Sequence, residues 1–479
     1  MTESHAPAAA PPRPVPLTAF ERRFRHPPGL VILFFAEMWE RFSYYGMRGL
    51  LKLYMANYLF VTLRERLQGC RQHVPPCPLV PGDPHGVFLW STLQHWFPAN
   101  PAEAASLLYG AYTGLVYATP FFGGILADRW LGQRRTVVIG GLLMALGHFV
   151  MAIESSFFLA LFLLILGNGA FKPNVSTQVG GLYAPGDHRR DGAYTVFYMG
   201  INLGAFISNL VCGTLAAVFG WHYGFAAAGV GMLLGLAVYI AGGKYLAPDD
   251  LSKRKAAHQT ERKPLDPGEK KRVMALIALC LLNVVFWAVY EQQGNTMQSW
   301  ADAQTVWPKV LGFQIPSTWF QSVNPLMIVL FAPLLDLFWM RQARRGTEPT
   351  SVIKMAIGCT LLGLSFIVMI VGARIIGDGK GSPLWPVSCV LMLTIGELYL
   401  SPIGLSLVTK VSPARIVSMM MGMWLASSFL GNFLSGAIGV LYTRWPREAF
   451  FLLLTVLGVA AGLAIRAFNR PLHAVIGDE

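Results

Sequence analysis

The chain has 479 residues, of which 54% are hydrophobic and 13% are charged, and its formal net charge is +13. A soluble globular domain carries about 25% charged residues, so the composition excludes that class and indicates a polytopic all-α membrane protein. Repeated apolar runs of about 20 residues also exclude a β-barrel, which would show short alternating segments. The positive charge does not indicate a nucleic-acid partner, because the basic residues gather in alternate loops, as the positive-inside rule describes.

The chain begins with a polar tail over residues 1–28, which is rich in Pro and Ala. It has no apolar core, so we expect a retained, disordered cytoplasmic tail and not a signal peptide. We therefore expect a multi-pass protein of the plasma (inner) membrane with both termini, including the tail at 471–479, in the cytoplasm.

Apolar periodicity predicts twelve membrane-spanning helices. The predicted spans lie at about 30–60, 105–127, 134–153, 157–178, 193–219, 222–246, 273–300, 317–340, 352–376, 385–410, 414–442 and 447–468. The charged segment 247–272 is predicted to be a cytoplasmic linker. It divides the chain into two six-helix bundles at 29–246 and 273–470, an arrangement typical of secondary transporters.

One internal sequence similarity supports the interpretation that the two halves arose by duplication. GGILADRWLGQRR after the second span is similar to APLLDLFWMRQARRG after the eighth. Each is predicted to place an acid, Asp128 or Asp336, at the inner end of a helix just before an Arg cluster that includes Arg129. Charge that only fixes topology is the alternative, but the matched spacing favours a repeat with a gating role.

The first span carries charges that a lipid-facing helix would not tolerate. At about 100° per residue, one stripe of this helix carries Glu37, Arg41, Tyr44 and Arg48, and Glu40 lies beside it. A charge at mid-bilayer costs about 2.5–3.5 kcal/mol on the insertion scale. We therefore expect the stripe to face protein or water, with its charges paired and functional.

Three further ionisable residues, Lys172, Glu291 and Glu397, lie deep in later apolar segments. Each stands close to a helix-breaking Pro or Gly, and Asn324 precedes Pro325 in the same way. Broken helices expose backbone groups that must line protein or a cavity. An ion pair that only holds helices together is the alternative for any one charge, but seven charges from four spans favour a shared central cavity.

These seven residues are four acids and three bases, so full ionisation leaves one surplus negative charge. Such a charge is costly at depth in a membrane, and one bound proton cancels it. The set therefore suggests a proton as the coupling ion, with no other cofactor and no metal.

Aromatic side chains lie near these charges by helical spacing: Tyr44, Tyr45, Tyr117, Trp287, Tyr290 and Trp424. Trp287, one turn before Glu291, is either an ordinary packing residue or a wall of the cavity. A cavity with separate acids and bases, aromatic walls and amides suits a zwitterion, because acids pair with an ammonium and bases with a carboxylate. The sequence has no HExxH, GxSxG or P-loop motif, so we expect a secondary transporter and not an enzyme or an ATP-driven pump.

The six cysteines divide by position. Four lie in apolar segments and are predicted to be small core residues, namely Cys212, Cys280, Cys359 and Cys389. Cys70 and Cys77 share the long first outside loop, where they are either a local disulfide or two free thiols. A metal site is disfavoured there because His73 and His85 lack ligand spacing.

These residues resemble the proton-dependent oligopeptide transporter family (POT or PTR) of the major facilitator superfamily. Four motifs carry the resemblance: ExxERFxYYG at 37–46, GGILADRWLGQRRTV at 123–137, FKPN at 171–174 and YTVFYMGINLGAF at 194–206. FWAVYEQQG at 286–294 and FQSVNP at 320–325 are also similar to the family's seventh and eighth helices. The resemblance implies the superfamily fold. Twelve helices follow and not fourteen, because the linker is too short and too charged for the extra pair that many bacterial members insert.

The resemblance also implies how a peptide is held. Arg48 and Lys172 would attract its carboxylate, and Glu397 with Asn324 would hold its amino group. Contacts to the peptide backbone would come from Tyr44, Tyr45, Tyr117 and Asn202, beside the aromatic residues Trp287 and Trp424.

Gating and proton coupling are implied in the same way. Arg48–Glu291 would form an outside gate and Lys172–Glu397 an inside gate. Glu37, Glu40 and Arg41 would form the proton-coupling group, with Glu291 a second protonation candidate. The Glu40→Gln change is expected to abolish proton-driven uptake and to leave some downhill exchange.

The predicted function is proton-coupled symport of di- and tripeptides into the cytoplasm by alternating access, in a functional monomer. Peptide-like drugs are further cargo that only the resemblance implies. A transporter of nitrate or another small anion is one alternative, disfavoured because such branches typically lose the ExxER acids. A non-translocating peptide-sensing receptor is another, disfavoured because the linker offers no signalling domain.

Overall fold

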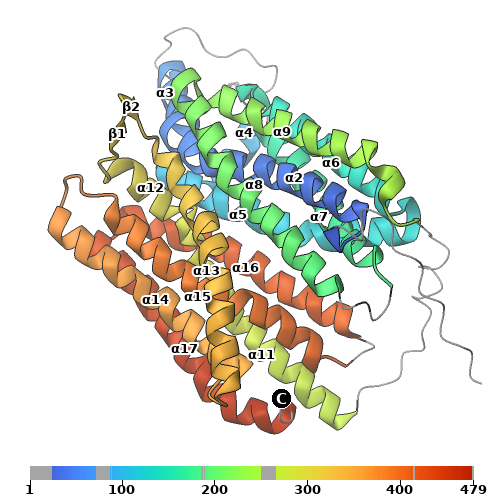
Figure 1. The fold of residues 1–479 in the computed structure, drawn as a ribbon. Coiled ribbons are helices and arrows are strands. Elements are labelled where there is room, and N and C mark those ends of the chain that lie inside the picture. The colour runs from blue at the N-terminus through green and yellow to red at the C-terminus, as the bar shows by residue number, and fades with distance from the viewer. Residues whose placement is uncertain are drawn as a thin grey trace, which may run out of the picture.

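The computed structural model describes residues 24–71, 87, 89–184, 187, 189–249, 266–413 and 416–476. Within them the regular elements are helices apart from one short hairpin of strands β1 (Lys309–Val310) and β2 (Phe313–Gln314). Figure 1 shows the helices of the first part of the chain, blue to green, packed beside those of the second part, yellow to red.

Most of the helices are long, as a membrane-spanning chain requires, and α4 and α12 are short. Those of the first part are α2 (Pro28–Tyr54), α3 (Phe60–Arg71), α4 (Trp90–Leu93), α5 (Pro101–Leu126), α6 (Gln133–Val150), α7 (Phe157–Gly181), α8 (Arg189–Phe219) and α9 (Trp221–Ala241). Those of the second part are α11 (Pro267–Tyr290), α12 (Thr296–Ala303), α13 (Val323–Arg344), α14 (Ser351–Ile376), α15 (Leu384–Val411), α16 (Val417–Arg444) and α17 (Arg447–Ile476).

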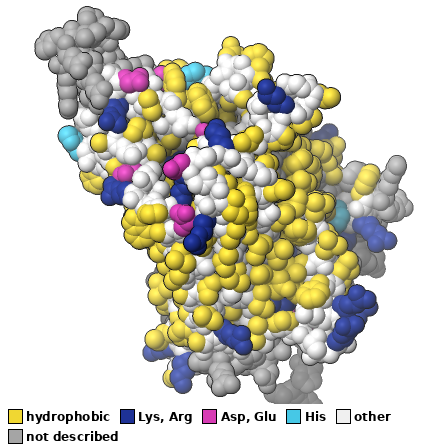
Figure 2. All heavy atoms as spheres, turned by 90° about the vertical axis from the view of Figure 1, so that its left-hand side faces the viewer, with side chains coloured by type: hydrophobic (Ala, Val, Ile, Leu, Met, Phe, Trp, Pro, Cys, Tyr) yellow, Lys and Arg dark blue, Asp and Glu magenta, His cyan; other side chains and the backbone are white. Residues whose placement is uncertain are grey.

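The surface and the helix lengths agree with a multi-pass membrane protein. Nine segments of the described chain are long and apolar enough to cross a membrane. Figure 2 shows a broad band of apolar side chains, with most of the charged side chains of that face gathered above and below it. The count of twelve crossings and the side on which the termini lie stay predictions.

Buried apolar side chains form two separate clusters. One runs from Leu30 to Leu246 and the other from Leu276 to Ile465. We refer to these parts of the molecule as the first and second halves. The end that carries α3 and the β1–β2 hairpin is the hairpin end (Figure 1), and the opposite end, where the first half stops at Asp249 and the second begins at Asp266, is the linker end.

The two halves meet backbone to backbone along α5 and α16. A Cβ atom on Gly110 would lie 2.6 Å from the Cα of Gly436, and one on Gly114 would lie 3.1 Å from the carbonyl oxygen of Phe429. Only glycine allows so close an approach. We call this contact the glycine seam. It runs from the hairpin end toward the middle of the molecule.

Both described ends of the linker cap a helix. The Asp249 carboxylate accepts a hydrogen bond of 2.9 Å from the backbone N–H of Arg134, in the first turn of α6. Asp266 and Glu269 form a capping box that starts α11 at Pro267, six residues before the predicted 273. Acceptors at a helix N-terminus satisfy N–H groups that have no intrahelical partner, so each half holds its own end of the linker.

The predicted helix breaks differ in outcome. The α-helix does stop at Tyr290, and residues Glu291–Gln293 form a 3-10 turn. Pro173 and Pro402, in contrast, lie inside the continuous helices α7 and α15, so a break at either position was wrong. Pro325 lies in the first turn of α13, where its missing N–H has no intrahelical partner in any case.

Candidate functional site

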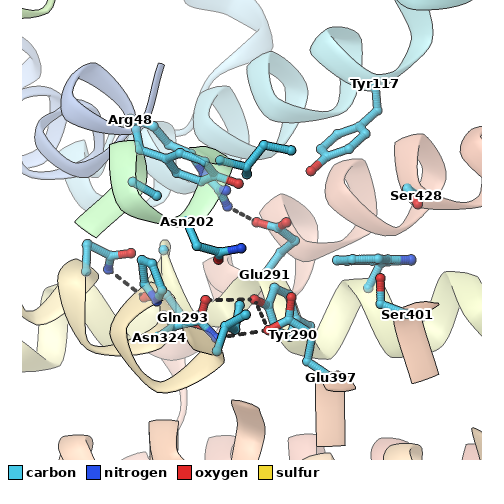
Figure 3. A pocket seen from close by; sticks show the side chains of 18 of the residues that line it. Arg48, Tyr117, Asn202, Tyr290, Glu291, Gln293, Asn324, Glu397, Ser401 and Ser428 are labelled. Atoms are coloured by element: carbon cyan, nitrogen blue, oxygen red, sulfur yellow. Dashed lines mark hydrogen bonds and ion pairs between the residues drawn. The ribbon is translucent and has the colours of Figure 1, made fainter. Parts of the chain in front are cut away.

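A cavity of about 320 Å³ lies between the two halves, near the middle of the molecule. This volume is at the lower end of the range for small-molecule sites. Figure 3 shows polar side chains of both halves pointing into it. Ten predicted site residues line it: Tyr45, Arg48, Tyr117, Lys172, Asn202, Trp287, Glu291, Asn324, Glu397 and Trp424.

An ion pair between Arg48 and Glu291 closes the cavity toward the hairpin end. Arg48 comes from α2, and Glu291 is the first residue of the 3-10 turn that follows α11. The Arg48 guanidinium also donates a hydrogen bond of 2.8 Å to the hydroxyl of Tyr109. The predicted outside pair is therefore formed, and it joins the two halves.

The predicted inside pair is not formed. Lys172 and Glu397 both line the cavity, but among the described residues no salt bridge joins them. The Lys172 ammonium instead lies 4.5 Å from the centre of the Tyr117 ring. The cavity thus presents a cation on the first half and a carboxylate on the second.

Glu397 is held by its neighbours through one oxygen. Its Oε2 accepts 2.8 Å from the Tyr290 hydroxyl and 2.9 Å from Asn324 Nδ2. The other hydrogen of that amide is donated to Thr394 Oγ1 over 3.0 Å. The two bonds to Glu397 are drawn in Figure 3, and they hold the carboxylate at the edge of the cavity.

A second charged cluster lies beside the cavity on α2. One guanidinium, that of Arg41, contacts both Glu40 and Glu37, the latter over 3.2 Å. Glu40 accepts through both oxygens, because its Oε1 also receives 2.7 Å from Arg41 and 3.1 Å from Asn168. Glu37 Oε2, in contrast, is buried and has no hydrogen-bond partner among the described residues. The three predicted proton-coupling residues of α2 are brought together, and their sum is one negative charge.

Of two residues predicted to contact the peptide backbone, one lies away from the cavity and the other lines it. Tyr44 is buried and does not line the cavity, although we expected it to face the peptide. Its ring centre is 5.1 Å from the Arg41 guanidinium carbon, so the ring packs beside the acidic cluster of α2. Asn202 does line the cavity, and its side-chain amide donates 3.0 Å to the backbone oxygen of Tyr198.

The loop candidates lie away from the cavity. Asp128 and Arg129 belong to a π-helical turn, Ala127–Leu131, that ends α5. Asp336 is exposed within α13, which continues to Arg344. The expectation that Asp336 lies at the end of a helix, as Asp128 does, was therefore wrong, since the first Gly or Pro after it is Gly346, just beyond the end of α13.

Some polar neighbours of the site were not predicted. They are Tyr109 on Arg48, Asn168 on Glu40, and the hydroxyl of Tyr290 on Glu397. Asn168 had a usable signal, because it stands one turn before Lys172 on the same helix face. Tyr290 was predicted only as an aromatic residue near the charges, and nothing in the sequence indicated that its hydroxyl would bind Glu397.

The four cysteines predicted to be core residues are buried free thiols, at 212, 280, 359 and 389. The choice between a disulfide and free thiols for Cys70 and Cys77 falls on side chains outside the described part of the chain.

A clasp at the hairpin end joins the halves beside the glycine seam. The Glu103 carboxylate accepts 2.6 Å from Arg444 and 3.0 Å from Thr443. The hydrogen bond from Arg444 is the main cause that holds the pKa of Glu103 below its usual 4.5. A lowered pKa means that the clasp is fully present above pH 4.5 and is lost as the pH falls through the lowered value. The clasp is therefore intact near neutral pH.

We expect Glu103→Gln to weaken closure of the hairpin end only modestly, because Arg444 is 55% exposed. An exposed pair is worth about 0–1 kcal/mol, so the open population should rise by less than about fivefold. Distances between spin labels at Thr92 and Lys380 measure this. Glu154→Gln is the matched control, because Glu154 accepts from Tyr58 within the same half. An equal shift in both variants would contradict a clasp between the halves.

Comparison with known proteins shows the family of this chain. The chain matches the POT family (PTR2) over residues 134–263 and 249–452. It is 35% identical to the peptide transporter YePEPT of Yersinia enterocolitica, over 87% of this chain and 88% of the relative. It is 31% identical to a di-/tripeptide transporter of Lactococcus lactis subsp. cremoris, over 95% and 97%.

Solved structures agree as well. A crystal structure of a variant POT peptide transporter in complex with alafosfalin is 33% identical, with a TM-score of 0.78, and the match covers 95% of this chain and 97% of that one. A POT family transporter in complex with 5-aminolevulinic acid is 27% identical, with a TM-score of 0.77 over 94% and 97%. The fold is therefore of the major-facilitator type, and this multi-pass membrane protein belongs to the POT family.

Proposed function

We propose that this protein is a monomeric proton-coupled symporter that carries di- and tripeptides into the cytoplasm. The observation that carries the proposal is the charge arrangement of the central cavity. An unpaired Lys172 ammonium and a Glu397 carboxylate line one cavity from opposite halves. A zwitterion placed between them neutralises both charges, and this is the chemistry of a short peptide.

Each end of the peptide has a receptor in this arrangement. Its carboxylate binds Lys172, and Arg48 joins when it is released from Glu291. Its ammonium binds Glu397, which Tyr290 and Asn324 already hold in place. Tyr45, Tyr117 and Trp287 wall the cavity without a charge of their own, which leaves room for varied side chains.

The coupling proton binds the acidic cluster on α2. Arg48 cancels Glu291, and Lys172 balances Glu397 across the cavity, so the surplus negative charge of the seven residues falls on Glu37, Glu40 and Arg41. Both Glu40 oxygens have donors, whereas Glu37 Oε2 is buried without one. An unsatisfied buried carboxylate oxygen is costly, so the proton is held at Glu37 when the cavity has this shape. Glu291 remains the second candidate, after it leaves Arg48.

Alternating access follows from the two pairs. Several hydrogen bonds join the halves at the hairpin end, including Asn57–Asp302 at 3.0 Å and Trp319–Thr214 at 3.0 Å. The outer pair Arg48–Glu291 is formed while Lys172 and Glu397 stay apart. This is the arrangement of a transporter closed to the outside. The reverse arrangement, with Lys172–Glu397 formed, would open the hairpin end to incoming peptide.

We expect purified protein in proteoliposomes to accumulate labelled dialanine when the outside is more acidic than the inside. A gradient of one pH unit stores about 1.4 kcal/mol per proton, which supports up to about tenfold accumulation for one coupled proton. Liposomes without protein, and proteoliposomes with a proton ionophore, are the controls.

The same preparation separates the alternatives. Accumulation of nitrate, and not of dialanine, would support a small-anion transporter. Dialanine binding without any uptake would support a sensing receptor. Dialanine uptake that equilibrates but never exceeds the outside concentration would contradict proton coupling.

A further inference from the structure

Among the described residues, the Tyr290 hydroxyl is the only donor from α11 to Glu397. It donates 2.8 Å to Glu397 Oε2. Because a bond to a charged acceptor is stronger than a neutral one, it contributes more than the weak 3.4 Å contact between the same hydroxyl and Asn324 Oδ1.

The ring of Tyr290 is fixed before any peptide binds. It stacks on Phe286 at 5.8 Å between ring centres and meets Trp287 edge-on at 5.2 Å. Tyr290 is also the last residue of α11, directly before the turn that carries Glu291. The packing of the ring therefore fixes the position of the hydroxyl donor independently of the Glu397 carboxylate.

Donors from two helices meet at one oxygen of Glu397. Tyr290 and Asn324 both bind Oε2, and the other hydrogen of Asn324 Nδ2 is used by Thr394. A carboxylate has about four acceptor positions over two oxygens. With Oε2 held by these two donors, Oε1 is the oxygen that remains to accept from an ammonium, and Glu397 lines the cavity.

We propose that Tyr290 is a positioning residue for amino-group recognition: its hydroxyl aims Glu397 and so sets the preference for peptides with a free amino terminus. This rests on the proposed function, in which Glu397 binds that amino group. Tyr290 itself need not touch the ammonium. A phenylalanine would keep the stacking on Phe286 and lose only the hydrogen bond.

The test compares two probes on purified wild-type and Tyr290→Phe protein: dialanine and N-acetyl-dialanine, each as a competitor of labelled peptide. The ratio of their dissociation constants measures recognition of the amino group. Tyr290→Phe should lower this preference about tenfold, the size of one hydrogen bond to a charged group. Tyr117→Phe removes a hydroxyl on the other half, and it should change both probes by the same factor.

A double-mutant cycle gives a second readout that needs dialanine alone. If Tyr290 acts through Glu397, the effect of Tyr290→Phe should fall to less than about twofold in a Glu397→Gln background. An unchanged probe ratio, or the same loss in both backgrounds, overturns the proposal. Failure of wild-type protein to bind dialanine would instead overturn the proposed function, and so the two failures are distinguishable.

Discussion

The Glu37→Gln variant is expected to lose gradient-driven accumulation of dialanine while keeping peptide exchange across the membrane. Glutamine is uncharged and nearly isosteric, so it mimics the protonated acid permanently. Glu40 and Arg41 would then balance each other, and Asn168 would keep its acceptor. With one pH unit of gradient, accumulation should fall from up to about tenfold to about onefold.

Glu40→Gln is the matched comparison, because it removes the same charge from the same cluster. It also replaces one carboxylate oxygen with an NH2 group, although Arg41 donates to both oxygens of Glu40 and Asn168 donates to Oε1. At least one donor would lose its acceptor, which costs about 1–3 kcal/mol. Accumulation should again be lost, and exchange should be slower than in Glu37→Gln. Equal loss of accumulation and exchange in both variants would mean that the cluster only holds helices together.

Removing either charge of the cavity is the second change with a large expected effect. Lys172→Ala and Glu397→Ala should each raise the KM for dialanine by about tenfold or more, since a hydrogen bond to a charged group is worth about 1.5–3 kcal/mol. Turnover should fall as well, because the inside pair of these residues can no longer form. Uptake kinetics of the purified variants measure both effects.

Modified substrates separate the two ends of the site. Lys172→Ala should weaken the binding of dialanine strongly and the binding of its C-terminal amide only slightly. Glu397→Ala should weaken the binding of dialanine strongly and the binding of N-acetyl-dialanine only slightly. Wild-type uptake by either variant would remove that residue from the site. A loss that is equal for modified and unmodified substrates would point to a folding defect.

The sequence predicted the features that follow from the free energy of moving a side chain from water into lipid. Charges at 37, 48, 172, 291 and 397 stand out because a buried charge is costly, and that cost is local to the residue. Four of these charged residues, at 48, 172, 291 and 397, line one cavity. A break close to Glu291 was predicted because Gly294 follows it, and α11 does stop at Tyr290.

Other features depend on packing between segments far apart in the chain, which residue type alone does not encode. Tyr44 and Tyr45 are neighbours on one helix, yet only Tyr45 lines the cavity. Their difference is set by the rotation of α2 against its neighbours. Pro173 and Pro402 stay inside continuous helices, since surrounding helices can satisfy the backbone groups that a proline frees. The hydroxyl of Tyr290 gained its role only from the approach of α15.

The glycine seam between α5 and α16 has a consequence for how this fold can acquire new cargo. Its contacts are made by backbone atoms of Gly110, Gly114 and Gly436, and no cavity side chain takes part. The part of the free energy of closure that these glycine contacts supply is thus independent of the residues that meet the substrate, whereas the Arg48–Glu291 pair serves both closure and the cavity. Mutations of the uncharged cavity walls can alter selectivity while leaving the glycine seam in place, and this separation makes the scaffold readily evolvable.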